Sequence, residues 1–286
     1  MIDFWESMTA SQVIPELSRN TEDWRKIKSA YDLAFNATVN QEAGQIPRRI
    51  HQIWLGKPLP KAYKDWCRSW KIWHPGWEYQ LWTERDIAAL RLENYDAFQN
   101  SPNFGVKSDI ARYEILWRFG GIYVDTDFQC LTQFDPLIGK AHFIAGIMYG
   151  TKPAINNGLI CSAAGHPILR AMIDHLRLPF DGHHGMDILA YSGPIQFTKV
   201  ILSFLASNQD LLILPTSYFY PFPNTDVERE TTESARGWIR PESLAIHYWE
   251  TSWKKQALRT KLYWWLKKRQ PAVASLVYRL LKGRPN

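Results

Sequence analysis

The chain has 286 residues, of which 45% are hydrophobic and 22% are charged, and its formal net charge is +6. This length and apolar content suit one sizeable α/β domain with additions. The three cysteines are scattered and odd in number, which excludes a disulfide framework and a cysteine-rich zinc module and favours a reducing, cytoplasmic compartment.

The N-terminal region is expected to be a helical extension spanning residues 1–45. Its first stretch, MIDFWESMTASQVIPEL, contains early acids and no uninterrupted apolar core, so we do not expect a signal peptide. No stretch of the chain reaches the apolar length of a transmembrane helix.

From residue 46 onward, strand-like runs alternate with helix-like ones. Strands are expected over 49–55, 77–82, 121–125, 143–149, 159–162, 211–214 and 243–248, and helices over 61–73, 84–92, 108–119, 167–178 and 194–206. Such alternation predicts an α/β fold, in which a mostly parallel sheet has helices on both faces and binds ligands at the carboxyl ends of its strands. No Gly-x-Gly-x-x-Gly loop follows the first strand, which argues against a nicotinamide dinucleotide enzyme.

The expected helix 108–119 carries two charged residues on one face. Ser108 can cap its start, and Gly120-Gly121 can end it as C-terminal glycines do. Asp109 and Arg112 stand at i and i+3, so they are neighbours on the helix surface. They form either a surface ion pair or part of a nucleotide-sugar site, and the spacing alone does not choose.

Two aspartates, Asp125 and Asp127, directly follow the apolar run 122–124. In a strand, residues i and i+2 point to the same face, so the two carboxylates suit Mg²⁺ or Mn²⁺ better than zinc. An aspartyl-phosphate phosphatase and a calcium loop both require other residues at Gln129 or Cys130. Two interpretations remain: a solvated turn, or the Asp-x-Asp of nucleotide-sugar glycosyltransferases, where a metal neutralises charge on the departing diphosphate.

An ordered series of segments around this pair resembles glycosyltransferase family 32. The most specific is KSDIARYEILWRFGGIYVDTD, residues 107–127. The others are IPRRIHQIWLGKPLP (46–60), SWKIWHPGWEYQLWT (69–83), Asn156-Asn157-Gly158, Gly165-His166-Pro167, Ser192-Gly193-Pro194, and AIHYW (245–249) with Ser252-Trp253. That family includes initiating α-1,6-mannosyltransferases and bacterial capsule and lipopolysaccharide transferases, and glucosylating toxin domains are more distant relatives. The resemblance implies a GT-A fold with a single Rossmann-like nucleotide-sugar-binding domain.

The resemblance also implies roles for individual residues in the N-terminal half of that domain. It assigns Asp109 and Arg112 to ribose, sugar hydroxyls and phosphate, and Asp125 and Asp127 to the metal and the diphosphate. Trp54 matches a tryptophan that stacks on the nucleobase in related toxins, and the alternative for it is a core aromatic.

Four residues of the C-terminal half complete the expected site. Asn157 is expected near the transferred sugar, and Asp187 as a sugar or acceptor contact. Trp253 is expected in a mobile loop that closes over the diphosphate and excludes water. His247 either adds an imidazole ligand to the metal or is an ordinary buried histidine.

The resemblance implies a retaining hexosyltransferase that depends on Mn²⁺ or Mg²⁺. Its expected donor is a nucleoside diphosphate sugar, with UDP preferred because of Trp54. Its expected acceptor is an oligosaccharide, lipid-linked, in capsule, O-antigen or lipopolysaccharide synthesis. The alternatives are a GDP-mannose-dependent mannosyltransferase, a metal-dependent phosphohydrolase and a non-catalytic nucleotide-sugar-binding protein.

Basic charge is concentrated at the C-terminus. Residues 252–286 hold ten Lys or Arg and no Asp or Glu, so residues 1–251 carry −4 of the total +6. Apolar residues recur at helical spacing on both sides of Pro271, which predicts a basic amphipathic tail over 254–286, after a glycosyltransferase domain over 46–253. We expect the tail to bind the anionic inner face of the cytoplasmic membrane, with packing on the domain as the alternative. A nucleic-acid partner is not expected, because no nucleic-acid-binding module accompanies the charge.

Overall fold

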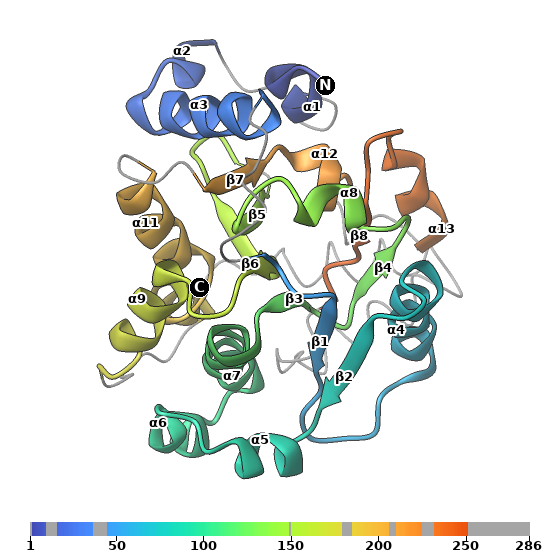
Figure 1. The fold of residues 1–286 in the computed structure, drawn as a ribbon, viewed down its shortest axis with the longest axis vertical. Helices are drawn as coiled ribbons and strands as arrows, with labels where there is room; N and C mark the ends of the chain where they lie inside the picture. The colour runs from blue at the N-terminus through green and yellow to red at the C-terminus, as the bar shows by residue number, and fades with distance from the viewer. Residues whose placement is uncertain are drawn as a thin grey trace, which may run out of the picture. The chain divides into compact units, whose positions relative to one another are not determined.

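A mixed β-sheet, which contains both parallel and antiparallel strand pairs, lies at the centre of the fold (Figure 1). The computed structural model describes residues 2–9, 16–36, 45–148, 150–178, 185–205, 210–224 and 232–250. Within these ranges, six strands pair in the order β2-β1-β3-β6-β5-β7. Their bounds are Arg49–Ile53 (β1), Glu78–Trp82 (β2), Gly121–Val124 (β3), Phe143–Ile147 (β5), Ile155–Ser162 (β6) and Leu211–Leu214 (β7). Only β6 runs antiparallel to its neighbours, so the expected mostly parallel sheet is confirmed.

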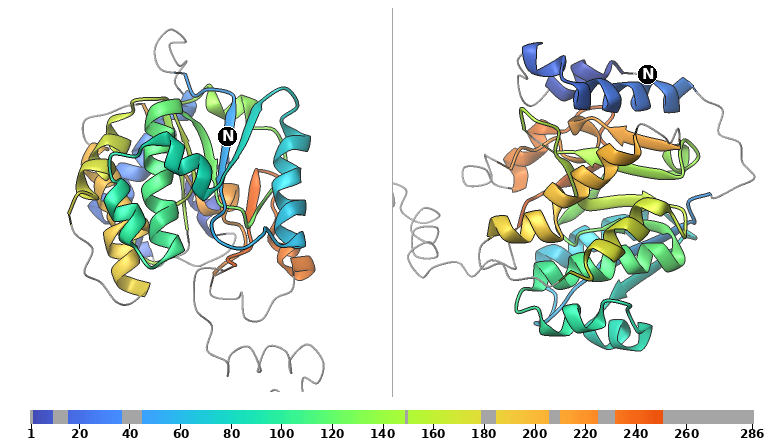
Figure 2. Two further views of the ribbon diagram at one scale, coloured as in Figure 1. Left: turned by 90° about the horizontal axis from the view of Figure 1, so that it is seen from below. Right: turned by 90° about the vertical axis from the view of Figure 1, so that its left-hand side faces the viewer.

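Helices cover both faces of this sheet (Figure 2). The helices α7 (Phe104–Phe119), α9 (Pro167–His175) and α11 (Pro194–Phe204) lie on one face, and α4 (Lys61–Trp73) lies on the other. The strands β3, β5 and β6 are buried at every residue, as expected for strands covered on both faces. Shorter helices complete the chain: α5 (Glu84–Leu90), α6 (Tyr95–Asn100), α8 (Asp135–Ile138), α10 (Gly185–Tyr191), α12 (Thr216–Phe219), α13 (Thr232–Ala235) and the 3-10 turn Arg236–Trp238.

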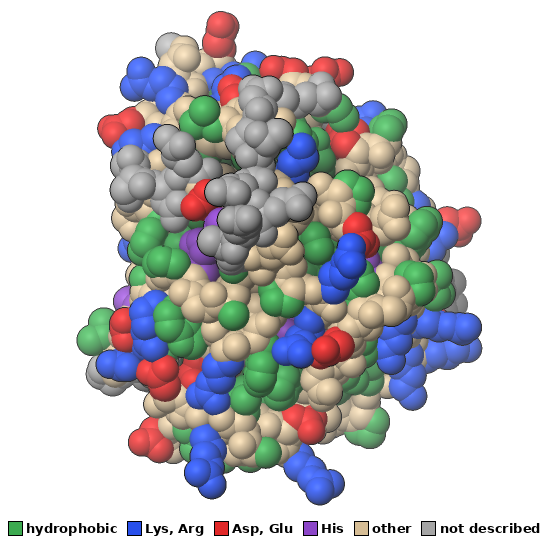
Figure 3. Space-filling model, in the orientation of Figure 1, with side chains coloured by type: hydrophobic (Ala, Val, Ile, Leu, Met, Phe, Trp, Pro, Cys, Tyr) green, Lys and Arg blue, Asp and Glu red, His purple; other side chains and the backbone are tan. Residues whose placement is uncertain are grey.

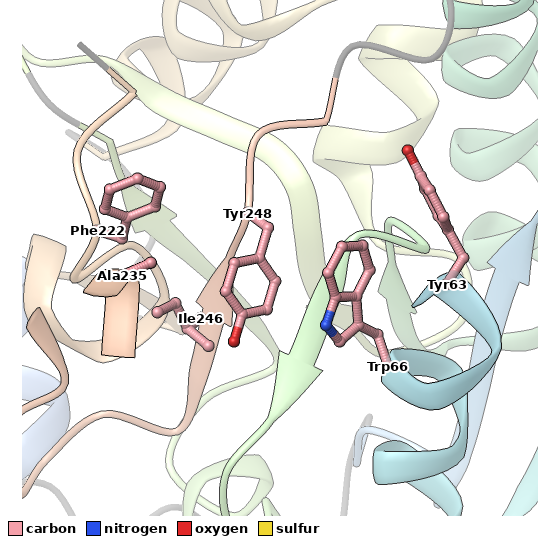
Figure 4. Packing of buried hydrophobic residues seen from close by; sticks show 6 residues of the cluster. All are labelled: Tyr63, Trp66, Phe222, Ala235, Ile246 and Tyr248. Carbon is pink, nitrogen blue, oxygen red and sulfur yellow. The ribbon is translucent and has the colours of Figure 1, made fainter. Parts of the chain in front are cut away.

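A second, two-stranded antiparallel sheet joins β4 (Phe128–Cys130) to β8 (Ala245–His247). An aromatic cluster holds β8 against α4, as Figure 4 shows. Within it the rings of Trp66 and Tyr248 stack with their centroids 4.7 Å apart. This packing brings residues near 247 in the sequence to the turn that follows β3, although about 120 residues separate the two in the chain.

The N-terminal helices are α1 (Phe4–Thr9), α2 (Glu16–Arg19) and α3 (Glu22–Asn36). Helix α3 packs on β7, and Trp24, Ile27 and Tyr31 of α3 are fully buried. Leu33 of the same helix is 52% exposed. These helices belong to the same compact unit, residues 1–249, as the sheet.

The start of α7 differs from expectation. The helix begins at Phe104, and the side-chain oxygen of Asn103 caps it by accepting hydrogen bonds from the N–H groups of Gly105 and Val106. The prediction of Ser108 as the cap is therefore wrong. The predicted end is confirmed: Gly120 follows the helix with φ of +59°, a conformation that favours glycine.

In the described part of the chain, no helix is long and apolar enough to cross a membrane. The basic tail 254–286 lies outside the described residues, so its predicted helices and the division of the chain at residues 45 and 253 stay predictions.

Candidate active site

The Asp-x-Asp pair lies at the carboxyl end of β3, beside the carboxyl end of β1. The Asp125 N–H donates to the Gly158 carbonyl of β6 at 2.8 Å, and the Asp127 carbonyl accepts from the Tyr248 N–H at 3.0 Å. The Asp127 side chain is 9% exposed and that of Asp125 is 29% exposed. The interpretation as a solvated turn is therefore wrong, because backbone hydrogen bonds fix both residues in a largely enclosed position.

His247 of β8 joins the two aspartates. Its Nε2 lies 3.1 Å from Asp127 Oδ2, and one ligand atom from each of Asp125, Asp127 and His247 lies within 4.8 Å of the others. The imidazole stacks on the Phe128 ring at a centroid distance of 4.2 Å, which fixes its orientation. Carboxylates suit Mg²⁺ and Mn²⁺, and an added imidazole favours the transition metal of the two. The donor set thus fits the expected cation.

Arg112 of α7 lies directly beside Asp125. Its Nη2 is 3.2 Å from Asp125 Oδ1 and 3.0 Å from Asp109 Oδ1, and its Nη1 donates to the Asn157 carbonyl at 2.7 Å. The guanidinium also lies over the Tyr123 ring, 4.5 Å from its centroid. Because Asp109 and Arg112 are both buried, they are not a surface ion pair; they bring a fixed positive charge to the Asp-x-Asp pair.

Both carboxylate oxygens of Asp109 are engaged. Oδ1 accepts from Asn157 Nδ2 at 2.9 Å as well as from Arg112, and Oδ2 accepts from Ser192 Oγ at 2.6 Å. Burial raises the pKa of Asp109 to about 6, although Arg112 and Ser192 act in the opposite direction. Asp109 therefore anchors Arg112 and Asn157, and its role toward ribose and sugar hydroxyls stays a prediction.

Three residues at this site carried no role in the sequence analysis. The Tyr123 O–H donates to Asp125 Oδ1 at 2.7 Å, and the strand alternation that pairs the two aspartates also puts Tyr123 on their face. A Cβ at Gly158 would lie 2.8 Å from Asp125 Oδ2, so a glycine is needed there. Ser192 belongs to a segment that matched the family, but its partner Asp109 is 83 residues away.

Burial raises the pKa of Asp125, and Arg112 opposes this shift.

Trp54 directly follows β1. Its backbone N–H donates to the Trp82 carbonyl at 3.0 Å, and its indole N–H donates to the Lys57 carbonyl at 2.5 Å. The half-buried ring packs at the edge of the aromatic cluster, 5.0 Å from the Tyr63 ring centroid. It is thus partly a core contact, and its role in stacking on a nucleobase stays a prediction.

The roles expected for two further residues stay predictions. Asp187 lies partly exposed in the first turn of α10 and takes no part in the hydrogen bonds given above. Trp253 lies outside the described residues.

The chemistry of this site matches one class of enzyme. Transfer from a nucleotide sugar requires positive charge around a departing diphosphate. Here the buried Arg112 lies beside a group of side chains of the kind that bind metals. Residues 60–144 match the family described as "Glycosyltransferase sugar-binding region containing DXD motif", and residues 161–266 match "Alpha 1,4-glycosyltransferase conserved region". The class is therefore the DXD glycosyltransferases.

Proteins of similar sequence show which family within this class the chain belongs to. The chain is 30% identical over 240 residues to Inositol phosphoceramide mannosyltransferase 1 of Schizosaccharomyces pombe. The alignment covers 76% of this chain and 73% of the relative. It is 21% identical to the Initiation-specific alpha-1,6-mannosyltransferase of Candida albicans, over 86% of each chain. The chain belongs to this family of DXD-containing glycosyltransferases, and the prediction of a glycosyltransferase enzyme is confirmed.

Coverage is lower for other relatives: the chain spans 51% of the length of Inositol phosphoceramide mannosyltransferase 3 of Schizosaccharomyces pombe. Among solved structures, the PaToxG glycosyltransferase aligns with a TM-score of 0.45 and 20% identity, covering 63% of this chain and 79% of that one.

Proposed function

We propose that the protein transfers a mannosyl residue from a nucleoside diphosphate sugar to a hydroxyl group of a glycan or an inositol phosphate lipid. One observation carries this proposal: Asp125, Asp127 and His247 converge beside the Arg112 guanidinium. The relatives named above support the choice of mannose, and the first of them supports an inositol phosphate lipid as acceptor.

A divalent cation, Mn²⁺ or Mg²⁺, would be held by Asp125, Asp127 and His247 and would supply the charge neutralisation that a departing diphosphate needs. The protein's own contribution is a preorganised positive group, the Arg112 guanidinium. Arg112 cannot rotate away, because Asp109, Asp125 and the Asn157 carbonyl fix its guanidinium from three sides. A group fixed in this way stabilises developing charge without reorganising during the reaction.

The state of Asp109 bears on stereochemistry. A retaining enzyme that forms a covalent intermediate needs a free carboxylate nucleophile. Both oxygens of Asp109 are occupied, and Asp125 and Asp127 belong to the proposed metal site. For the retention that the resemblance implies, these contacts favour a front-face route over a covalent intermediate, and in that route the departing diphosphate helps to deprotonate the acceptor hydroxyl.

The donor base and the cellular setting rest on separate observations. The preference for UDP rests on Trp54, whereas transfer of mannose favours the alternative donor GDP-mannose. The setting in capsule, O-antigen or lipopolysaccharide synthesis rests on the resemblance of the sequence alone, and an inositol phosphate lipid replaces it here as the first acceptor to test. Attachment to the cytoplasmic face of a membrane through the tail 254–286 rests on charge and spacing.

The test is a calorimetric titration of UDP and of GDP, each with and without Mn²⁺, on the wild type and on Asp127→Ala. We expect one nucleotide to bind tightly only with metal, and Asp127→Ala to lose that binding while its circular dichroism is unchanged. Turnover of the matching sugar nucleotide should then release nucleoside diphosphate rather than inorganic phosphate, which separates transfer from phosphohydrolysis. Full activity of Asp127→Ala would reject the metal assignment.

A further inference from the structure

A cleft of about 450 Å³ lies away from the Asp-x-Asp pair, at the other end of the strands. Arg48 directly precedes β1, and the turn from His74 to Trp77 directly precedes β2. Its lining is completed by Trp73, at the end of α4, and by Gln133 and Asp135. Because β1 and β2 are parallel, their amino ends form the edge of the sheet opposite to the one that carries Trp54.

Two tryptophans give this cleft an aromatic surface. Trp73 is 43% exposed and Trp77 is partly exposed, and no hydrogen-bond partner reaches either indole N–H within the described residues. Both indole rings line the same cleft, so their exposed faces are available together to a ligand. Indole rings suit ligands that have one apolar face and a polar edge.

The polar groups of the cleft are balanced in charge. Arg48 Nη2 lies 3.0 Å from Asp135 Oδ1, with the side chains 69% and 33% exposed, and so exposed a pair contributes little to stability. The exposed Gln133 amide adds a donor and an acceptor. His74 contributes no free nitrogen, because Nδ1 bonds the Trp70 carbonyl and Nε2 accepts from the Phe134 N–H.

These features select a class of ligand. One positive and one negative charge together disfavour phosphates, nucleotides and other strongly charged molecules. A guanidinium, a carboxylate and an amide offer donors and acceptors side by side, which suits hydroxyl groups that both donate and accept. The volume falls within the range of about 300–1,000 Å³ that is usual for small-molecule sites. A neutral pyranose ring fits this combination, with its C–H face on indole and its hydroxyls on the polar side.

We propose that this cleft is a second saccharide site, separate from the metal and diphosphate site, that binds a neutral hexopyranosyl unit without metal or nucleotide. In the proposed transferase it would hold a distant unit of a glycan acceptor or product. The proposal rests on the proposed function only for that role; saccharide binding itself requires no catalytic activity.

The experiment is ligand-observed NMR titration of the full chain with methyl α-mannoside, methyl α-glucoside and methyl β-galactoside, in EDTA and without nucleotide. We expect at least one saccharide to bind, with Trp73→Ala weakening it by about tenfold or more. The control is Ile72→Ala, since Ile72 is 63% exposed in the same helical turn but does not line the cleft. Asp127→Ala should bind the saccharide as the wild type does.

Absence of binding by all three saccharides overturns the proposal. So does binding that survives in Trp73→Ala and is lost in Asp127→Ala, because that places the saccharide at the catalytic site. If Trp73→Ala does not fold, Gln133→Ala at an exposed position takes its place, with the same expected weakening. A chain that binds saccharide in this cleft but turns over no sugar nucleotide would keep this proposal and reject the proposed function.

Discussion

Gly158 touches the Asp125 carboxylate, and this contact leaves no room for a side chain. A Cβ there would lie 2.8 Å from Asp125 Oδ2 and 3.0 Å from Asn156 Oδ1. Asp125 cannot move away freely, because its Oδ1 is held by Tyr123 and Arg112. We expect Gly158→Ala to weaken Mn²⁺-dependent nucleotide binding roughly 10–100-fold, as changes beside a metal ligand do, and calorimetry measures this.

The control for that prediction is Gly139→Ala. Gly139 has φ of −85° and nothing within 4 Å of an added Cβ, so this variant should bind metal and nucleotide as the wild type does. Unchanged binding in Gly158→Ala would show that the Asp125 carboxylate does not hold the position described here.

The hydrogen bond from Ser192 lowers the pKa of the Asp109 carboxyl group. Burial raises that pKa to about 6. In Ser192→Ala that pKa therefore rises further, because the Asp109 carboxylate loses a hydrogen bond. A protonated Asp109 no longer forms the ion pair that fixes the Arg112 guanidinium, so activity falls on the acid side. We expect the acid limb of the kcat/KM profile to move to higher pH in Ser192→Ala, with little difference at pH 8.

Ser203→Ala is the matched control, because Ser203 is exposed on α11 and bonds only the Val200 carbonyl among the described residues. A merely structural role for Ser192 would lower activity equally at every pH, and that result would contradict the prediction.

At the scale of elements, strand β1 contains a buried histidine that is satisfied only when neutral. His51 Nε2 donates to the Gly120 carbonyl at 2.9 Å, and Nδ1 accepts from the Trp82 indole N–H at 3.1 Å. Protonation of Nδ1 would place a second donor opposite the Trp82 indole N–H, and the hydrogen bond between them would be lost. Burial lowers the pKa of His51 to about 4 from its ordinary 6.5, so the unfolded chain binds this proton first as the pH falls. Stability from His51 is therefore present above pH 6.5 and is lost toward pH 4.

Urea unfolding at pH 7.5 and pH 5 measures this loss. For one histidine with those pKa values, the free energy of unfolding should fall by about 2 kcal/mol more in the wild type than in His51→Gln. His74 and His166 also have lowered pKa values and remain in both proteins, so only the difference between the two counts. An equal loss in both proteins would rule out this role for His51.

Elements with marked ends could be predicted from the sequence, and those set by distant partners could not. The ranges of α4 and β7 agree with expectation residue for residue, since Pro60 precedes α4, and Asp210 and Pro215 flank a purely aliphatic β7. Only the second half of β6 was expected, because Asn156, Asn157 and Gly158 in its first half are of types that are depleted in strands. The three-residue β4 shows no periodicity of its own and exists because β8 pairs with it.

The same distinction holds for the candidate site. The residues Asp109, Arg112, Asp125 and Asp127 all lie in the segment 107–127, and the resemblance of that segment to a known family grouped them where spacing alone did not. The occupation of Asp109 by Ser192 and Asn157 could not be predicted, because those contacts depend on how α7, β6 and the turn before α11 pack. Packing, rather than pattern, decides that Asp109 anchors its neighbours.

At the scale of the whole molecule, charge is divided between a slightly acidic enzyme and a basic tail. Residues 252–286 carry ten Lys or Arg, and the rest of the chain carries −4. Near an anionic surface each basic residue contributes about 1 kcal/mol to binding. We expect the full chain to bind vesicles that contain anionic lipid, and Lys267→Glu/Lys268→Glu/Arg269→Glu to lose more than about 100-fold in affinity by sedimentation with vesicles.

Helix α4 supplies the matched control for the tail. Lys and Arg side chains gather over it at the right-hand edge of Figure 3, and Lys61, Lys64 and Arg68 are exposed there. Lys61→Glu/Lys64→Glu/Arg68→Glu makes the same change in net charge, so unspecific repulsion from the vesicle would affect both variants alike. A loss confined to the tail variant, and weaker binding of the wild type at high salt, would assign membrane attachment to the tail. If only the α4 variant loses binding, the folded domain itself holds the membrane surface and the tail has another role.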